Sequence, residues 1–125
     1  MTLLLVLCVA AGGCIGAPSR FLLDRFVADR AEMDFPLGTF LVNASGSFVL
    51  GLLTGLAIAG PVSVYLKTFL GSGFCGAYTT FSTWNYETVS LLERGELLEA
   101  GLNAAGSLVV GLLAAGAGMA LGLLR

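Results

Sequence analysis

Two sets of uncharged polar side chains recur at helical spacing within apolar stretches of this 125-residue sequence. Intervals of four residues separate Thr39, Asn43 and Ser47, and the same interval separates Asn103 and Ser107. Side chains four residues apart share one face of an α-helix, so each set predicts a polar stripe. An amide or hydroxyl facing hydrocarbon would lose its hydrogen bonds, so both stripes should face protein or water. They indicate either hydrogen bonding between helices or the lining of a path for water or an ion.

The segment 71–84 (GSGFCGAYTTFSTW) is rich in Gly, Ser and Thr, although it lies within the charge-free run 68–86. Glycine is a poor helix former, so this composition favours a broken helix. Backbone carbonyls freed at membrane depth must be buried in protein, line a cavity or hold an ion. A hard cation such as sodium prefers such oxygen ligands. The alternative is a continuous helix whose hydroxyls bond to carbonyls one turn back.

An aromatic pair closes this segment. Phe81 and Trp84 lie three residues apart and therefore share a helix face. The edge of an aromatic ring is electropositive, so two edges turned toward a pore would attract an anion without any formal charge. Ordinary packing of the two rings is the alternative.

The elements that must position these residues are membrane helices. Hydrophobic residues make up 57% of the chain and charged residues 11%, against about 25% charged residues in soluble domains. A membrane-spanning helix takes roughly 20 residues. The sequence therefore predicts an all-α membrane protein, a single four-helix transmembrane domain over residues 1–125. The expected helices are 3–27, 37–59, 63–93 (broken near its middle) and 97–123.

Composition argues against several function classes. The net charge is −2 without a basic tract, so nucleic acid is not an expected partner. Histidine is absent, which removes the commonest general base, and we do not expect an enzyme. Cys8, Cys14 and Cys75 lie in apolar runs without metal-site spacing and are interpreted as small hydrophobic residues. The apolar N-terminus has no basic residue before Arg20, which favours a retained helix over a signal peptide.

The distribution of basic residues gives only a weak orientation signal. One side of the expected bundle carries four basic residues and the other side carries two. The first set is Arg20, Arg25, Arg30 and Arg94, and the second is Lys67 and Arg125. The positive-inside rule mildly favours termini outside the cell, and so small a bias also permits insertion in both orientations.

Three motifs in order resemble those of a known membrane family. Residues 12–20 (GGCIGAPSR) resemble its GGxxGAxxR signature, residues 38–46 (GTFLVNASG) its GTxxVNxxG, and residues 73–83 (GFCGAYTTFST) its GFxGGxTTFST. The motifs stand in order at the positions expected in a four-helix chain, and the resemblance covers its full length. The chain is thereby identified as similar to the Fluc or CrcB fluoride channels.

This resemblance implies passive export of fluoride across the plasma membrane of a bacterial cell. It implies a dual-topology dimer, in which a second copy packs antiparallel and two fluoride pathways form between the subunits. It also implies a structural sodium ion, not transported, held at the dimer centre by the backbone carbonyls of Gly76 and Thr79. The anion pathway implied by the resemblance comprises Asn43, Phe81, Ser82, Thr83, Trp84 and Ser107. Glu87 matches a family glutamate to which we assign no role.

The sequence departs from the family pattern at three informative positions. Trp84 stands where a second phenylalanine is expected, Asn103 where tyrosine is expected, and Ala77 where the motif has a second glycine. An indole is larger than a phenyl ring and carries an N–H donor. These departures leave open that the chain is one specialised subunit of a heterodimeric fluoride channel, paired with a homologous chain.

Two rival functions make different demands on the sequence. A small four-helix multidrug exporter needs an embedded carboxylate in its first helix, and the first acidic residue here is Asp24. A structural membrane subunit without transport would not account for both polar stripes and the hydroxyl-rich segment. A passive channel needs no residue that couples transport to energy, which agrees with the scarcity of embedded titratable groups.

Overall fold

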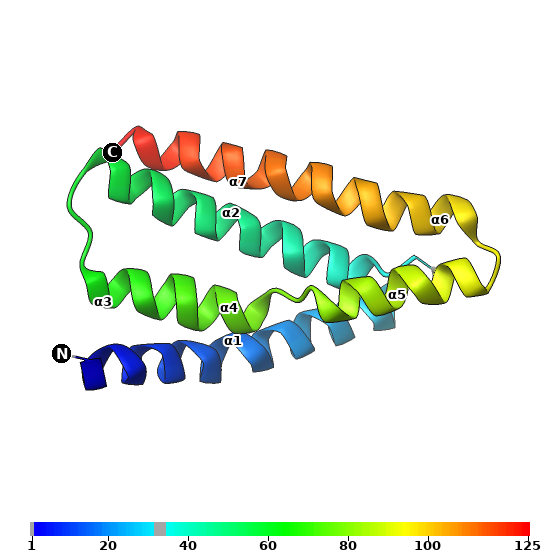
Figure 1. Cartoon of the computed structure of the whole chain (residues 1–125), viewed down its shortest axis with the longest axis horizontal. Coiled ribbons are helices and arrows are strands. Elements are labelled where there is room, and N and C mark those ends of the chain that lie inside the picture. Colours follow the sequence, from blue (N-terminus) through cyan, green and yellow to red (C-terminus); the bar gives the residue numbers. More distant parts are fainter. Residues whose placement is uncertain (1, 32–34) are drawn as a thin grey trace.

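Four helical passes run along the long axis of the protein (Figure 1). The computed structural model describes residues 2–31 and 35–125, and every regular element within them is helical. The first two passes are α1 (Thr2–Arg30) and α2 (Leu37–Ala59). The third comprises α3 (Val64–Lys67), the π-helical η1 (Thr68–Cys75), α4 (Gly76–Tyr78) and α5 (Ser82–Glu93). The fourth comprises α6 (Leu97–Gly101), the π-helical η2 (Leu102–Gly106) and α7 (Ser107–Leu123).

The observed bounds lie close to the expected ones. The second and fourth passes begin and end at the expected residues, whereas the first continues to Arg30. The third begins at Val64, one residue later than expected, because Ser63 is its N-cap. The Ser63 hydroxyl accepts a hydrogen bond of 3.2 Å from the Tyr65 N–H, as capping residues commonly do.

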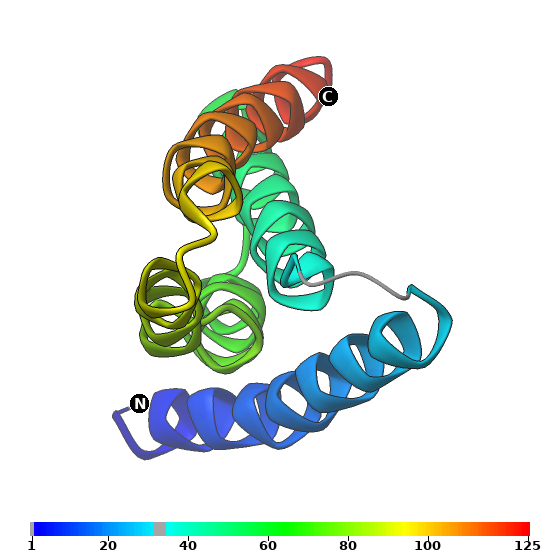
Figure 2. The ribbon, with the colours of Figure 1, turned by 90° about the vertical axis from the view of Figure 1, so that its right-hand side faces the viewer.

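The third pass is broken between α4 and α5. Thr79 has extended backbone angles, φ −79° and ψ 158°, which an α-helix cannot contain. Seen end-on, the two halves of this pass form separate coils, so their axes are displaced (Figure 2). The alternative of a continuous third helix is therefore wrong. One hydroxyl of the segment does bond to a carbonyl one turn back, as expected for a continuous helix. Thr79 Oγ1 donates to the Cys75 carbonyl at 2.8 Å.

Glycines hold α2 against α7. An added β-carbon on any of four glycines would collide with a backbone carbonyl oxygen of the facing helix. These are Gly51 and Gly55 on α2, and Gly118 and Gly122 on α7. Each pair has GxxxG spacing, so small residues on both helices let the two backbones meet. Two further glycines, Gly12 and Gly16, let α1 approach carbonyls of η1 in the same way.

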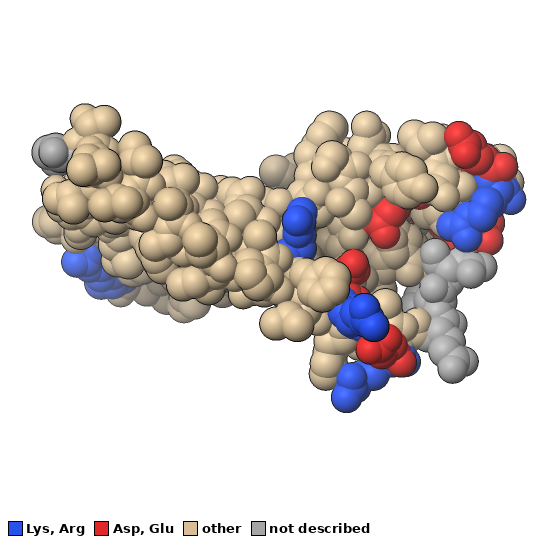
Figure 3. All heavy atoms as spheres, turned by 90° about the horizontal axis from the view of Figure 1, so that it is seen from below, with Lys and Arg blue, Asp and Glu red and all other residues tan. Residues whose placement is uncertain are grey.

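The outer surface fits a membrane. Large apolar side chains are exposed along every pass, among them Leu22, Leu108 and Leu113. Most of the charged side chains visible in Figure 3 gather toward one end of the molecule, and a basic group lies near the opposite end. Three helices of the described chain are long and apolar enough to span a bilayer, namely Thr2–Arg30, Leu37–Ala59 and Leu97–Leu123. The third pass is divided by its break. The chain is thus a multi-pass membrane protein.

We expect Gly118→Ala to destabilise the α2–α7 contact, because its methyl group would meet the Phe48 carbonyl. Overpacking of this kind costs about 1–3 kcal/mol. The matched control is Gly116→Ala on the same helix, where an added β-carbon meets nothing within 4 Å. The midpoint of thermal unfolding in detergent should fall for the first variant and not for the second. Equal midpoints would contradict the role assigned to Gly118.

Candidate functional site

The break in the third pass is held by the side chain of Asn43 on α2. Asn43 Nδ2 donates to the Thr80 carbonyl at 2.9 Å, and Asn43 Oδ1 accepts from the Thr80 N–H at 2.8 Å. One side-chain amide therefore satisfies both backbone groups of Thr80, as a neighbouring peptide group would. Thr80 is buried, with 8% of its surface exposed. Backbone groups left unpaired at membrane depth cost several kcal/mol, so Asn43 makes the interruption tolerable.

These bonds leave two carbonyls without their helical donors. In an uninterrupted α-helix the Thr80 N–H would donate to the Gly76 carbonyl, but here it donates to Asn43. Likewise the Thr83 N–H, which would donate to the Thr79 carbonyl, donates to Thr80 Oγ1 at 3.2 Å. The oxygens of Gly76 and Thr79 are thereby available to another partner. They are the two carbonyls implied by the family resemblance.

A cavity of about 360 Å³ adjoins the break. The described residues that line it include no acidic or basic side chain. Six of them matter for the argument, namely Asn43, Ser47, Gly76, Thr79, Phe81 and Trp84. The cavity thus brings together Asn43 and Ser47 of the first polar stripe, the two residues whose carbonyls lack helical donors, and the aromatic pair, whereas Thr39 lines a different cavity. Ser82, Thr83 and Ser107 do not line it.

A second cavity of about 200 Å³ lies on another side of Thr80. Thr83 lines it, together with Arg20, Asp24 and Thr39. Asp24 also lines a larger cavity of about 510 Å³ at the charged end, beside Glu87. Glu87 Oε1 is buried there without a hydrogen-bond partner. Thr80 therefore separates a polar cavity facing the charged end from the uncharged cavity at the break.

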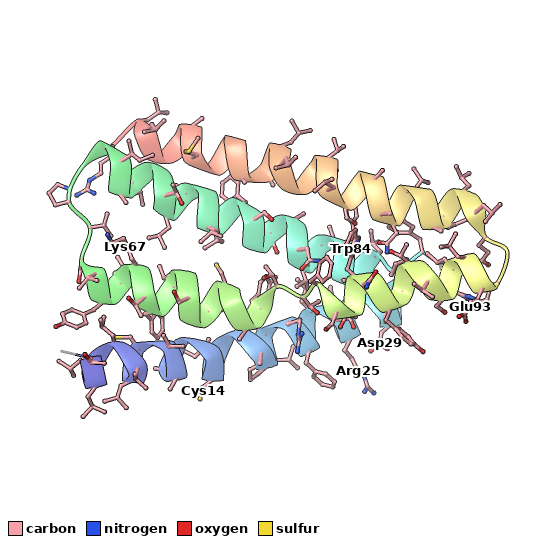
Figure 4. The ribbon with its side chains drawn as sticks, viewed as in Figure 1. Cys14, Arg25, Asp29, Lys67, Trp84 and Glu93 are labelled. Atoms are coloured by element: carbon pink, nitrogen blue, oxygen red, sulfur yellow. The ribbon has the colours of Figure 1, made fainter. Side chains whose placement is uncertain are left out.

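The two aromatic rings differ in exposure, since Phe81 is exposed and Trp84 is half-buried. The ring centroids of Phe81 and Trp84 lie 5.3 Å apart, with planes tilted by 48°. Phe81 is 72% exposed, whereas Trp84 lies between α5 and the fourth pass (Figure 4). Trp84 Nε1 donates to the Asn103 carbonyl at 2.8 Å. The two rings are in contact, and each also lines the cavity at the break.

The second polar stripe is satisfied within the chain. Asn103 is fully buried, and its Nδ2 donates to Thr88 Oγ1 at 2.8 Å and to the Trp84 carbonyl at 3.4 Å. Ser107 Oγ lies 3.5 Å from Asn103 Oδ1. Asn103 therefore bonds between helices, which is the structural interpretation of that stripe. Sequence reasoning missed Thr88, although its position four residues after Trp84 was a usable signal.

Replacing Asn43 with the isosteric Leu should destabilise the protein, because both backbone groups of Thr80 would lose their partners. An unsatisfied buried group costs about 1–3 kcal/mol, so the unfolding midpoint should fall by several degrees. Asn85→Leu is the matched control, since Asn85 is exposed on α5. A midpoint that moves equally in both variants would show that Asn43 does not hold the break.

Comparison with known proteins assigns the chain to a family. The family model described as "CrcB-like protein, Camphor Resistance (CrcB)" matches residues 7–119. A relative from Streptomyces avermitilis named "Fluoride-specific ion channel FluC 1" is 50% identical, covering 90% of this chain and 91% of its own length. A protein of the same name from Leifsonia xyli is 46% identical over 98% and 89%. "Fluoride-specific ion channel FluC" from Thermococcus gammatolerans is 48% identical over 85% of each chain. The resemblance carried by the three motifs is thus confirmed, and the chain belongs to the CrcB family.

Proposed function

We propose that this chain forms a fluoride-selective channel that lets fluoride leave the cell passively through the plasma membrane. The relatives named as fluoride-specific channels support this function over nearly the full chain. The structural observation that carries it is the broken third pass, held open by Asn43 beside a cavity without charged lining. The described residues of that lining include no acidic or basic side chain of the kind that couples a pump to proton movement.

The chemistry available at the break suits a small, strongly hydrated anion. Fluoride must exchange its water for other donors, and the proposed path offers hydroxyls, an amide and aromatic edges. Ser47 and Phe81 line the cavity at the break, and Thr83 lines the cavity on the other side of Thr80. Ser82, exposed at the start of α5, and Ser107 would extend the donors beyond the cavity.

Asn43 has two separable contributions in this proposal. Its Oδ1 and one Nδ2 hydrogen are used by Thr80, so its first contribution is to order the break. A primary amide has a second N–H, which these two bonds leave free. Because Asn43 lines the cavity, that second hydrogen is the group we assign to the anion.

The same break fits a structural sodium ion. The carbonyls of Gly76 and Thr79 lack their helical donors, and both residues line the cavity. Neutral carbonyl oxygens are the ligands that sodium finds at broken membrane helices. When bound, the ion would supply positive charge that offsets the carbonyl dipoles. One chain offers two such oxygens, and a copy related by a two-fold axis would offer two more.

We therefore propose an antiparallel, dual-topology dimer as the working channel. Its support lies in the two free carbonyls per chain, the 72% exposed ring of Phe81 and the weak charge bias. An unlike CrcB chain could take the second position and make a heterodimer. A closed C2 pair is also the commonest symmetry of protein dimers.

Purified protein reconstituted alone into liposomes should release trapped fluoride, as measured with a fluoride electrode. Asn43→Asp should abolish this efflux, because it removes the amide hydrogens and adds a negative charge.

Phe81→Leu should slow fluoride efflux at least about tenfold, equivalent to about 1.4 kcal/mol, while Phe26→Leu on α1 should not. Efflux by the wild-type chain also separates a self-sufficient channel from one that needs a partner chain. Unchanged efflux in Asn43→Asp would remove Asn43 from the path.

Replacing sodium by N-methylglucamine during purification should lower the thermal midpoint of the protein. A ligand that binds only the folded state stabilises it by mass action, by about 2.7 kcal/mol at 100 times its dissociation constant. The midpoint should rise with sodium concentration and respond less to potassium at equal ionic strength. A midpoint independent of the cation would count against a bound sodium ion.

A further inference from the structure

Trp84 and Asn103 are joined by hydrogen bonds running in both directions. The indole Nε1–H of Trp84 donates to the backbone carbonyl of Asn103 at 2.8 Å. In return, Asn103 Nδ2 donates to the Trp84 carbonyl at 3.4 Å and to Thr88 Oγ1 at 2.8 Å. The Thr88 hydroxyl donates to the Trp84 carbonyl at 2.8 Å. These bonds form a closed network between α5 and η2.

The network uses the one polar hydrogen that Trp84 has. An indole carries a single N–H donor and no acceptor. The N–H of Trp84 is bonded to the Asn103 carbonyl. Trp84 therefore contributes only the carbon atoms of its indole ring to the wall of the cavity at the break. An indole at this position would otherwise have offered an anion a direct hydrogen bond.

Asn103 is placed to fix the ring rather than to meet an ion. It is fully buried in η2, lines none of the cavities around the break and gives its amide to α5. A buried amide is costly unless it is bonded, so the network is stable only when Trp84 and Thr88 keep their places. The half-helix that begins at the break is thereby anchored to the fourth pass.

We propose that Asn103 is a positioning residue that locks the Trp84 ring into the wall of the anion path and withholds its N–H from the anion. This inference rests on the proposed fluoride function for its consequence, but the lock itself is a property of the folded chain. Trp84 then contributes only its aromatic ring to the path. Its indole differs from a phenyl ring mainly because its N–H is hydrogen-bonded to the Asn103 carbonyl.

The chain contains one tryptophan, so its indole N–H gives one assignable resonance in a ¹⁵N-labelled sample. We expect this hydrogen to exchange slowly with deuterated water. Titration with sodium fluoride should leave the resonance in place, as should sodium chloride at the same concentrations. A saturable shift caused by fluoride and not by chloride would overturn the inference, because it would place the N–H on the anion.

Asn103→Leu should speed exchange of the indole hydrogen about two- to tenfold, the range that corresponds to one lost hydrogen bond. Thr88→Val removes the hydrogen bond between Thr88 and Asn103 from the other side, so it should also speed exchange of the indole hydrogen. This variant provides the test if Asn103→Leu does not fold. Asn85→Leu, on the exposed side of α5, is the control and should leave exchange unchanged. Unchanged exchange in the variants of Asn103 and Thr88 would show that the network does not position the ring.

Fluoride efflux distinguishes this inference from the proposed function. Folded Asn103→Leu leaves the Trp84 ring without its anchor, so fluoride efflux should slow about two- to tenfold, whereas Asn85→Leu should keep the wild-type rate. Faster exchange of the indole hydrogen in Asn103→Leu together with an unchanged efflux rate would overturn the placement of the locked ring in the wall of the path. Absence of efflux from wild-type liposomes would instead refute the channel function, while the exchange measurements would still test the lock.

Discussion

A helix can be interrupted inside a membrane only if something replaces the hydrogen bonds that the interruption removes. Here the two bonds between the Asn43 amide and the backbone of Thr80 provide that replacement. The other features of the site depend on them. Because the Thr80 N–H points to Asn43, the Gly76 carbonyl loses its donor, α5 starts on a displaced axis, and a cavity forms beside the break. Mostly apolar helices thus enclose a polar cavity whose described lining residues carry no acidic or basic side chain.

Close helix packing is the condition for this interaction, since a side chain as short as Asn43 can reach Thr80 only if α2 lies against the third pass. Gly46, one turn after Asn43 on the same face, provides the space. A β-carbon there would collide with the Thr79 side chain. The Cys75 thiol also lies near the Gly46 carbonyl, at 3.8 Å. The spacing Asn-x-x-Gly therefore has a physical meaning, because one residue bonds to the break and the other lets it approach.

Much of this arrangement could be predicted from local sequence, and the rest could not for a definite reason. Apolar runs and turn residues placed the helices, and the density of Gly, Ser and Thr predicted the break. The partner of Asn43 lies 37 residues away and is a backbone group, which no side-chain pattern reveals. The same holds for the bond from Trp84 to the Asn103 carbonyl. The π-helical segments η1 and η2 were also missed, since an inserted residue leaves the apolar pattern nearly unchanged.

The buried amide of Asn103 and the half-buried amide of Asn43 are largely used in hydrogen bonds within the chain, and this constrains which groups could meet an ion. The Asn103 amide donates to α5, whereas the Asn43 amide has one N–H that is not used by Thr80. The groups left over are the free carbonyls, the hydroxyls near the break and the exposed ring of Phe81. They lie on a cavity that opens at the surface of the chain, where lipid would leave a dehydrated anion without enough donors. In the proposed dimer, the surface of the second chain would cover this cavity and replace lipid there.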